Sequence, residues 1–180
     1  MSQQGFQLKF IDIMVAVVLG LGFQWWPELK EPWQYIAFIF AYFNLVDYWI
    51  DYNPAAKKYT LGLEIDIVLH TLIIFSMFLL VFSAQQSLSY FLFAFGFYRA
   101  TDILWLCMIK AKHKKVTGDI VYVNTWLVSD IVESSVALGL GVVALYEIIA
   151  PLYILISFVL IRVCTRLLSS VRYKKIFYAF

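Results

Sequence analysis

Six long apolar stretches account for most of this 180-residue chain and constrain its fold more than any other feature. A helix needs about 20 mostly apolar residues to cross the hydrocarbon core of a bilayer, and each stretch is close to that length or longer. They cover residues 10–26, 33–52, 61–83, 87–110, 120–146 and 148–171. Little of the sequence remains for a soluble domain. We therefore predict an all-α polytopic membrane protein, with six transmembrane helices in a single domain of residues 1–180.

The lysine and arginine residues are sorted to one set of helix ends. With six spans, eleven of the fourteen flank the same side, Lys30 flanks the opposite side, and Arg99 and Arg162 lie inside spans. The eleven are Lys9, Lys57, Lys58, Lys110, Lys112, Lys114, Lys115, Arg166, Arg172, Lys174 and Lys175. Cytoplasmic segments carry an excess of Lys and Arg, so we predict that both termini are cytoplasmic. Basic residues in short juxtamembrane segments suit lipid headgroups, and we expect no nucleic-acid partner.

Ionisable residues inside the predicted spans are the main functional candidates. A charged side chain in a bilayer is costly, and it usually faces the interior of a bundle or an aqueous cavity. Eleven occur here: Asp12, Asp47, Asp51, Glu64, Asp66, His70, Arg99, Asp102, Asp130, Glu133 and Arg162. In the predicted topology they lie between the cytoplasmic interface and mid-depth. We therefore predict an inner mouth and polar interior formed by Asp12, Asp47, Asp66, His70, Asp130 and Glu133.

Several of these residues share a helix face, because residues three or four positions apart are neighbours on a helix. The pairs are Asp47 with Asp51, Asp66 with His70, Arg99 with Asp102, and Asp130 with Glu133. We interpret Arg99 and Asp102 as a structural ion pair that neutralises both members. Two acids near mid-depth, as at Asp130 and Glu133, require a cation, a proton or Arg162 nearby.

Two segments of the chain are similar to each other. Residues 12–22 and 130–141 both begin with Asp-Ile and both end with Leu-Gly-Leu-Gly, although the spacing differs by one residue. Each segment also has a pair of small residues four apart, Ala16 with Gly20 and Ser135 with Gly139, a pattern that lets helices approach closely. Short apolar matches arise easily by chance, so we infer helix packing from them and no internal duplication.

The start of the chain resembles a known family over residues 10–52. Phe10-Ile11-Asp12 stands near the start of the first span, while Pro32-Trp33 is followed by Ala37-Phe38 and, eleven residues further on, by Trp49. These residues resemble two motifs of the six-helix potassium channel family of lysosomes and endosomes, whose short bacterial members assemble as tetramers. In that family the first motif is Phe-Ser-Asp and the second begins Trp-Pro, so this sequence departs from both in detail.

The resemblance implies a monovalent cation channel. In that family the first helix of each subunit lines the pore, and the matching positions here are Val17 and, one turn later, Leu21. Their apolar side chains are expected to form a hydrophobic constriction, which selects among partly dehydrated cations. Asp12 is expected at the inner mouth. The resemblance further implies potassium transport by a homotetramer in a prokaryotic cell membrane, with no cofactor, bound metal or catalytic residue.

Other functions remain open from the residues alone. A divalent metal-ion carrier is one, because Asp47/Asp51 and Asp66/His70 have the spacing of paired oxygen and imidazole ligands on two helices. A proton-coupled transporter is a variant, in which Glu133 and His70 titrate. An intramembrane enzyme fits less well, because the sequence has neither a nucleophile elbow nor an HExxH zinc motif.

Overall fold

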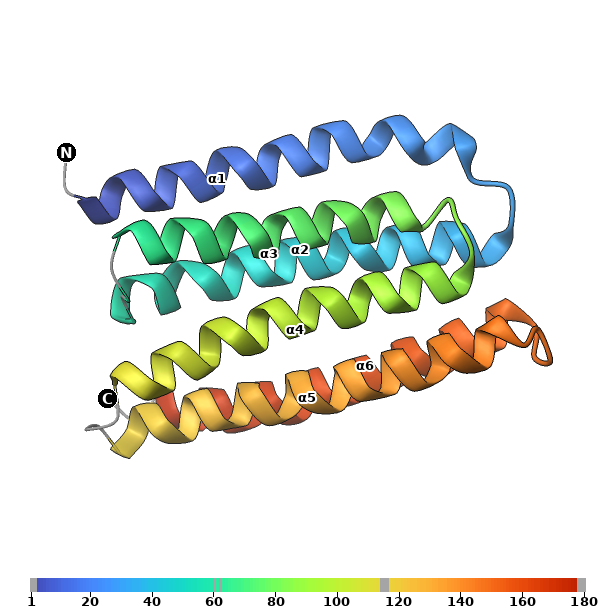
Figure 1. The fold of residues 1–180 in the computed structure, drawn as a ribbon. Helices are drawn as coiled ribbons and strands as arrows, with labels where there is room; N and C mark the ends of the chain where they lie inside the picture. The colour runs from blue at the N-terminus through green and yellow to red at the C-terminus, as the bar shows by residue number, and fades with distance from the viewer. Residues whose placement is uncertain (1–2, 60, 62, 114–116, 178–180) are drawn as a thin grey trace.

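The computed structural model describes residues 3–59, 61, 63–113 and 117–177 as a bundle of long helices that run side by side (Figure 1). The elements are α1 (Gln3–Gly22), the 3-10 helix η1 (Phe23–Glu28), α2 (Pro32–Lys58), α3 (Leu63–Ser83), α4 (Leu88–Lys112), α5 (Thr117–Leu145) and α6 (Pro151–Phe177). Successive helices are antiparallel, so α1 begins and α6 ends at the same end of the bundle. The prediction of an all-α fold is confirmed.

Five of the six helices are long and apolar enough to cross a membrane, which indicates a multi-pass membrane protein. The candidate spans are Lys9–Glu28, which covers most of α1 and all of η1, and Glu64–Ser83, Leu88–Lys112, Val123–Leu145 and Pro151–Val171 within α3, α4, α5 and α6. The remaining helix, α2, is long enough, but its sequence is less apolar because it contains Asn44, Asp47 and Asp51 and several Tyr and Trp residues. Its crossing, the total of six spans and the cytoplasmic location of the termini stay predictions.

Most helix ends lie close to the predicted boundaries, and local capping explains them. Pro32 and Pro151 each occupy the first position of a helix, where the missing N–H costs nothing. Ser87 accepts a hydrogen bond from the backbone N–H of Tyr90 at the start of α4. Three helices extend well past the predicted boundaries: α1 begins at Gln3, before residue 10, and α2 and α6 continue past residues 52 and 171 to Lys58 and Phe177. At α2 the helix runs through Asn53-Pro54 into alanine and lysine residues, which favour helix.

The centre of the bundle is an aromatic cluster that joins three helices. Phe40 of α2 packs against Phe95 of α4 and Phe158 of α6, with ring centroids 5.8 and 5.6 Å away. Phe95 and Phe158 meet edge to face at 4.8 Å. In contrast, α1 lies at one edge of the bundle, where it packs mainly on α3 and less on α2 (Figure 1). One side of α1 is therefore left uncovered by the chain itself.

Candidate functional site

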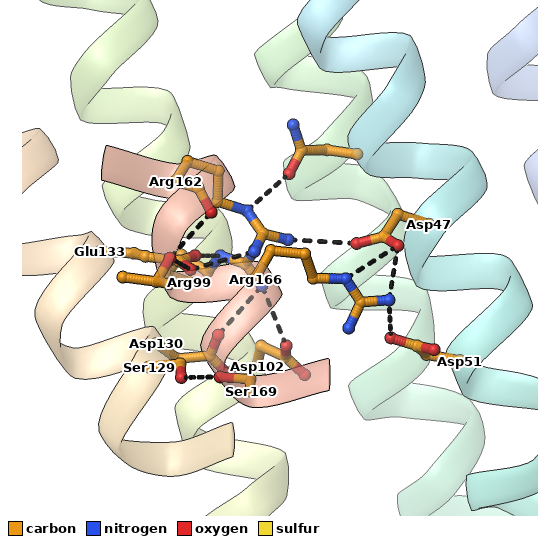
Figure 2. Close-up of polar contacts among 12 residues, drawn as sticks. Asp47, Asp51, Arg99, Asp102, Ser129, Asp130, Glu133, Arg162, Arg166 and Ser169 are labelled. Atoms are coloured by element: carbon orange, nitrogen blue, oxygen red, sulfur yellow. Dashed lines mark hydrogen bonds and ion pairs between the residues drawn. The ribbon is translucent and has the colours of Figure 1, made fainter. Parts of the chain in front are cut away.

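The interior of the bundle holds a group of eight ionisable side chains from four helices, which we call the charge cluster (Figure 2). Its members are Asp47 and Asp51 of α2, Arg99 and Asp102 of α4, Asp130 and Glu133 of α5, and Arg162 and Arg166 of α6. The outer surface of the bundle, by contrast, exposes many large apolar side chains. This arrangement is the reverse of a soluble protein and is the one expected in a bilayer.

Arg99 is the centre of the cluster and contacts three carboxylates. Its Nη1 lies 3.0 Å from Asp130 Oδ1 and 3.5 Å from Asp102 Oδ2, and its Nε lies 2.9 Å from Glu133 Oε2. The side chain is only 2% exposed. Nη1 also donates a hydrogen bond to the Tyr98 hydroxyl at 3.1 Å. The predicted pair of Arg99 and Asp102 is thus part of a larger network, and Asp102 is the most distant of the three acids.

Glu133 connects the two buried arginines. Its Oε1 accepts a hydrogen bond from Arg162 Nη1 at 3.0 Å, while its Oε2 faces Arg99. Arg162 in turn donates to Asp47 Oδ2 at 3.2 Å and to the side-chain oxygen of Asn44 at 3.3 Å. One continuous set of contacts therefore ties α4, α5, α6 and α2 together.

Arg166 extends the network toward the end of α2. It donates to Asp47 Oδ1 through both Nε and Nη2, at 3.1 and 2.6 Å, and its Nη2 lies 2.6 Å from Asp51 Oδ2. Its guanidinium also lies over the ring of Trp126, 4.7 Å from the centroid. Sequence analysis placed Arg166 among the basic residues at helix ends and missed its place in the cluster. Its spacing of four from Arg162 was the available signal.

The cluster contains more acids than arginines. With every group ionised, five carboxylates face three guanidinium groups, which leaves two negative charges in excess. A cavity of about 50 Å³ adjoins them, lined by Asp47, Asp51, Asp102, Arg99 and Arg162. Such a space accommodates a water molecule or a small cation. The geometry therefore suits the binding of positive charge more than of anions.

The remaining predicted polar residues lie outside this cluster. Asp12 is exposed and accepts a hydrogen bond from Trp49 Nε1 at 2.8 Å, which joins α1 to α2. Asp66 is buried and accepts from the backbone N–H of Leu61 at 3.0 Å. His70 is also buried, and its Nδ1 shares a 2.9 Å hydrogen bond with the hydroxyl of Tyr48. These three contacts link the first three helices and the segment before α3.

The predicted constriction residues face outward from a single chain. Val17 is 43% exposed and Leu21 is 49% exposed, on the side of α1 that no other helix of the chain covers. Both side chains are turned away from the interior of the bundle, so any pore that they form needs further copies of the chain.

A divalent metal site is not evident in the part of the chain that the structure describes. No group of three or more His, Cys, Asp or Glu side chains in that part is arranged to hold a metal ion. Asp47 and Asp51, one of the two predicted ligand pairs, instead contact Arg166.

Comparisons with known proteins identify no relative of this chain: no family model, no curated protein and no solved structure matches it.

Proposed function

We propose that the protein is a monovalent cation channel in which α1 from several copies lines a shared pore. The observation that carries this proposal is the uncovered apolar face of α1, the helix at the edge of the bundle. Ile13, Val17 and Leu21 follow one another at spacings of four, so they form a single stripe, and all three are exposed. A ring of such stripes encloses a hydrophobic constriction of the kind that selects among partly dehydrated cations.

Small residues beside this stripe support close approach of another helix. Ala16 and Gly20 are both exposed on the same side of α1. A Cβ added at Gly20 meets no heavy atom within 4 Å, so this glycine serves no close contact inside the chain. Small residues four apart are typical of contacts between transmembrane helices. A second copy of α1 is the partner that this surface fits best in the channel proposal.

The contact between Asp12 and Trp49 gives further support. These residues belong to the two motifs through which the chain resembles the six-helix potassium channel family, and they are hydrogen bonded at 2.8 Å. The bond fixes the part of α1 around Asp12 against α2, which orients the uncovered stripe. The proposal takes potassium as the main permeant ion, a homotetramer as the assembly and a prokaryotic cell membrane as the location from that resemblance.

Planar bilayer recordings of the purified chain under bi-ionic potassium and sodium conditions test the proposal. We expect unitary currents whose reversal potential changes in the Leu21→Ala variant. Leu104→Ala is the matched control, because Leu104 is 47% exposed on α4, close to the 49% of Leu21. Silent bilayers that contain folded protein contradict the proposal. Identical selectivity of the Leu21→Ala and Leu104→Ala variants contradicts the assignment of α1 to the pore.

A second candidate is a proton-coupled transporter that works within a single chain. The excess of two carboxylates in the charge cluster favours it, since those groups can take up and release protons. This candidate predicts a saturable flux that is abolished by Asp130→Asn and is unaffected by Leu21→Ala. A channel lined by α1 predicts the opposite response to the Leu21 substitution. A divalent metal carrier gains no comparable support from the described residues.

A further inference from the structure

We propose that Asp102 and Asp130 together bind a proton or a small monovalent cation inside the charge cluster, between α4 and α5. This site is separate from α1 and does not depend on the proposed pore. Three observations carry it: the excess of acids, the position of the two carboxylates around one nitrogen atom, and the adjoining cavity.

The charge balance requires a positive partner. Moving an ionised carboxylate into a low-dielectric interior is costly, and the cost is offset only where an opposite charge and hydrogen bonds compensate it. Three arginines compensate three of the five acids of the cluster. Arg166 and Arg162 are closely bound to Asp47, Asp51 and Glu133. Those two arginines face three acids, and Arg99 is left to Asp102 and Asp130. One of the two excess negative charges therefore falls on the pair of Asp102 and Asp130.

The geometry at Asp130 points to the same place. This carboxylate is 1% exposed, and neither of its oxygen atoms has a hydrogen-bond partner in the part of the chain that the structure describes. Its contact is with Nη1 of Arg99 at 3.0 Å, and the same nitrogen lies 3.5 Å from Asp102. Figure 2 shows the two carboxylates directed toward this one guanidinium group. Two like charges this close cannot both be ionised cheaply, so a shared cation between them is favoured.

Among the described residues, Arg99 is the basic residue whose ion pairs reach Asp102 and Asp130, while Arg162 and Arg166 form theirs with Glu133, Asp47 and Asp51. The titratable groups around the pair and its cavity are Arg99 and Tyr98 of α4, Glu133 of α5, Arg162 of α6, and Asp47 and Asp51 of α2. From α3, His70 packs against Trp105, which lines the cavity. The cavity of about 50 Å³ is bordered by Asp102 and gives a cation a place next to the pair.

Infrared spectroscopy of the purified chain in lipid nanodiscs tests this inference without any measurement of flux. In neutral buffer free of alkali ions, we expect the C=O stretching band of a protonated carboxyl group. Asp130→Asn and Asp102→Asn should each remove or reduce this band. Asp12→Asn should leave it unchanged, because Asp12 lies outside the cluster and bonds to Trp49.

Addition of sodium or potassium distinguishes the two kinds of cation. If an alkali ion replaces the proton, the band falls as the salt concentration rises, and binding of radioactive sodium or rubidium saturates. If the site is specific for protons, the band responds to pH alone. The absence of both a protonated carboxyl band and saturable alkali-ion binding in the wild-type chain overturns the proposal. Because these readouts use the wild-type chain, they stay decisive even if an aspartate variant fails to fold.

Discussion

Asp12 of α1 and Asp130 of α5 begin two similar segments of sequence but occupy opposite environments. Asp12 is exposed at the edge of the bundle, with the indole N–H of Trp49 as its hydrogen-bond donor. Asp130 is buried in the charge cluster, where it forms an ion pair with Arg99 and, among the described residues, no side-chain hydrogen bond that satisfies either oxygen atom. The comparison teaches that the neighbours of an acid in the sequence do not determine its role. Its role is determined by the partner that the fold brings close from another helix.

The glycines of the two segments, in contrast, behave alike. A Cβ added at Gly20 or at Gly139 meets nothing within 4 Å, so both face open space. A Cβ added at Gly22 comes within 2.9 Å of Val81 Cγ1 and also overlaps Tyr42, and one added at Gly141 lies 2.8 Å from the Phe93 ring. In each segment the first glycine is thus uncovered and the second permits close packing.

The largest change in stability is expected from removal of the Arg99 guanidinium group, which contacts Asp130 but not Asp12. Arg99→Ala leaves three buried acids without their shared guanidinium group, and the loss of one partner from a buried charge network costs about 3–5 kcal/mol. The free energy of unfolding in mixed detergent micelles measures it. Lys30→Ala, at an exposed lysine, is the control. A loss below about 1 kcal/mol contradicts a structural role for the cluster, since surface substitutions rarely exceed that range.

A smaller loss of stability is expected when Gly22, the closely packed glycine of α1, is replaced. Gly22→Ala forces Tyr42 to move, and the Tyr42 hydroxyl then loses its 2.7 Å hydrogen bond to the carbonyl oxygen of Leu19. Overpacking of this kind costs about 1–3 kcal/mol. Gly20→Ala, two residues earlier on the same helix, is the matched control. Equal stability of the two variants would show that α1 does not pack on α2 as described.

Loss of the hydrogen bond to Asp12 is expected to cost less again. Trp49→Phe keeps an aromatic ring at the contact but removes the N–H donor, and one such hydrogen bond contributes about 0.5–1.5 kcal/mol. Asp12→Ala removes the acceptor and is the second member of a double-mutant cycle. Thermal unfolding of both single variants and the double variant measures the coupling. Fully additive losses argue that Asp12 and Trp49 do not act as a pair.

The smallest effect is expected at the uncovered glycine of α5. Gly139→Ala introduces a methyl group into open space, and replacing glycine within a helix stabilises it by about 0.5–1 kcal/mol. Thermal unfolding of Gly139→Ala measures this gain, and the Gly141→Ala variant should lose stability in the same measurement. If Gly139→Ala destabilises the assembled protein but not the dissociated chain, then α5 also contacts another subunit.

Most of the helical framework could be predicted from the sequence, because apolar length and proline positions are local signals. The extension of α2 to Lys58 was missed, since Asn53-Pro54 indicates a helix end in the sequence although α2 continues through it. The pairing of Arg99 with Asp102 follows from helical spacing. Arg162 was one of the partners expected for Asp130 and Glu133, and it contacts Glu133. The contacts of Glu133 with Arg99, and of Arg166 with Asp47 and Asp51, depend on how the helices pack, so spacing within one helix does not indicate them.

Disulfide cross-linking in the membrane tests the central claim, that the uncovered face of α1 meets α1 of another copy. Cys107 and Cys164 are exposed and are first replaced by alanine. Leu21→Cys is then introduced and oxidised, with Leu104→Cys as the control at similar exposure on α4. The account predicts covalent dimers from Leu21→Cys and few or none from Leu104→Cys. Folded protein that stays monomeric with cysteine at position 21, and likewise in the Val17→Cys variant, would contradict it.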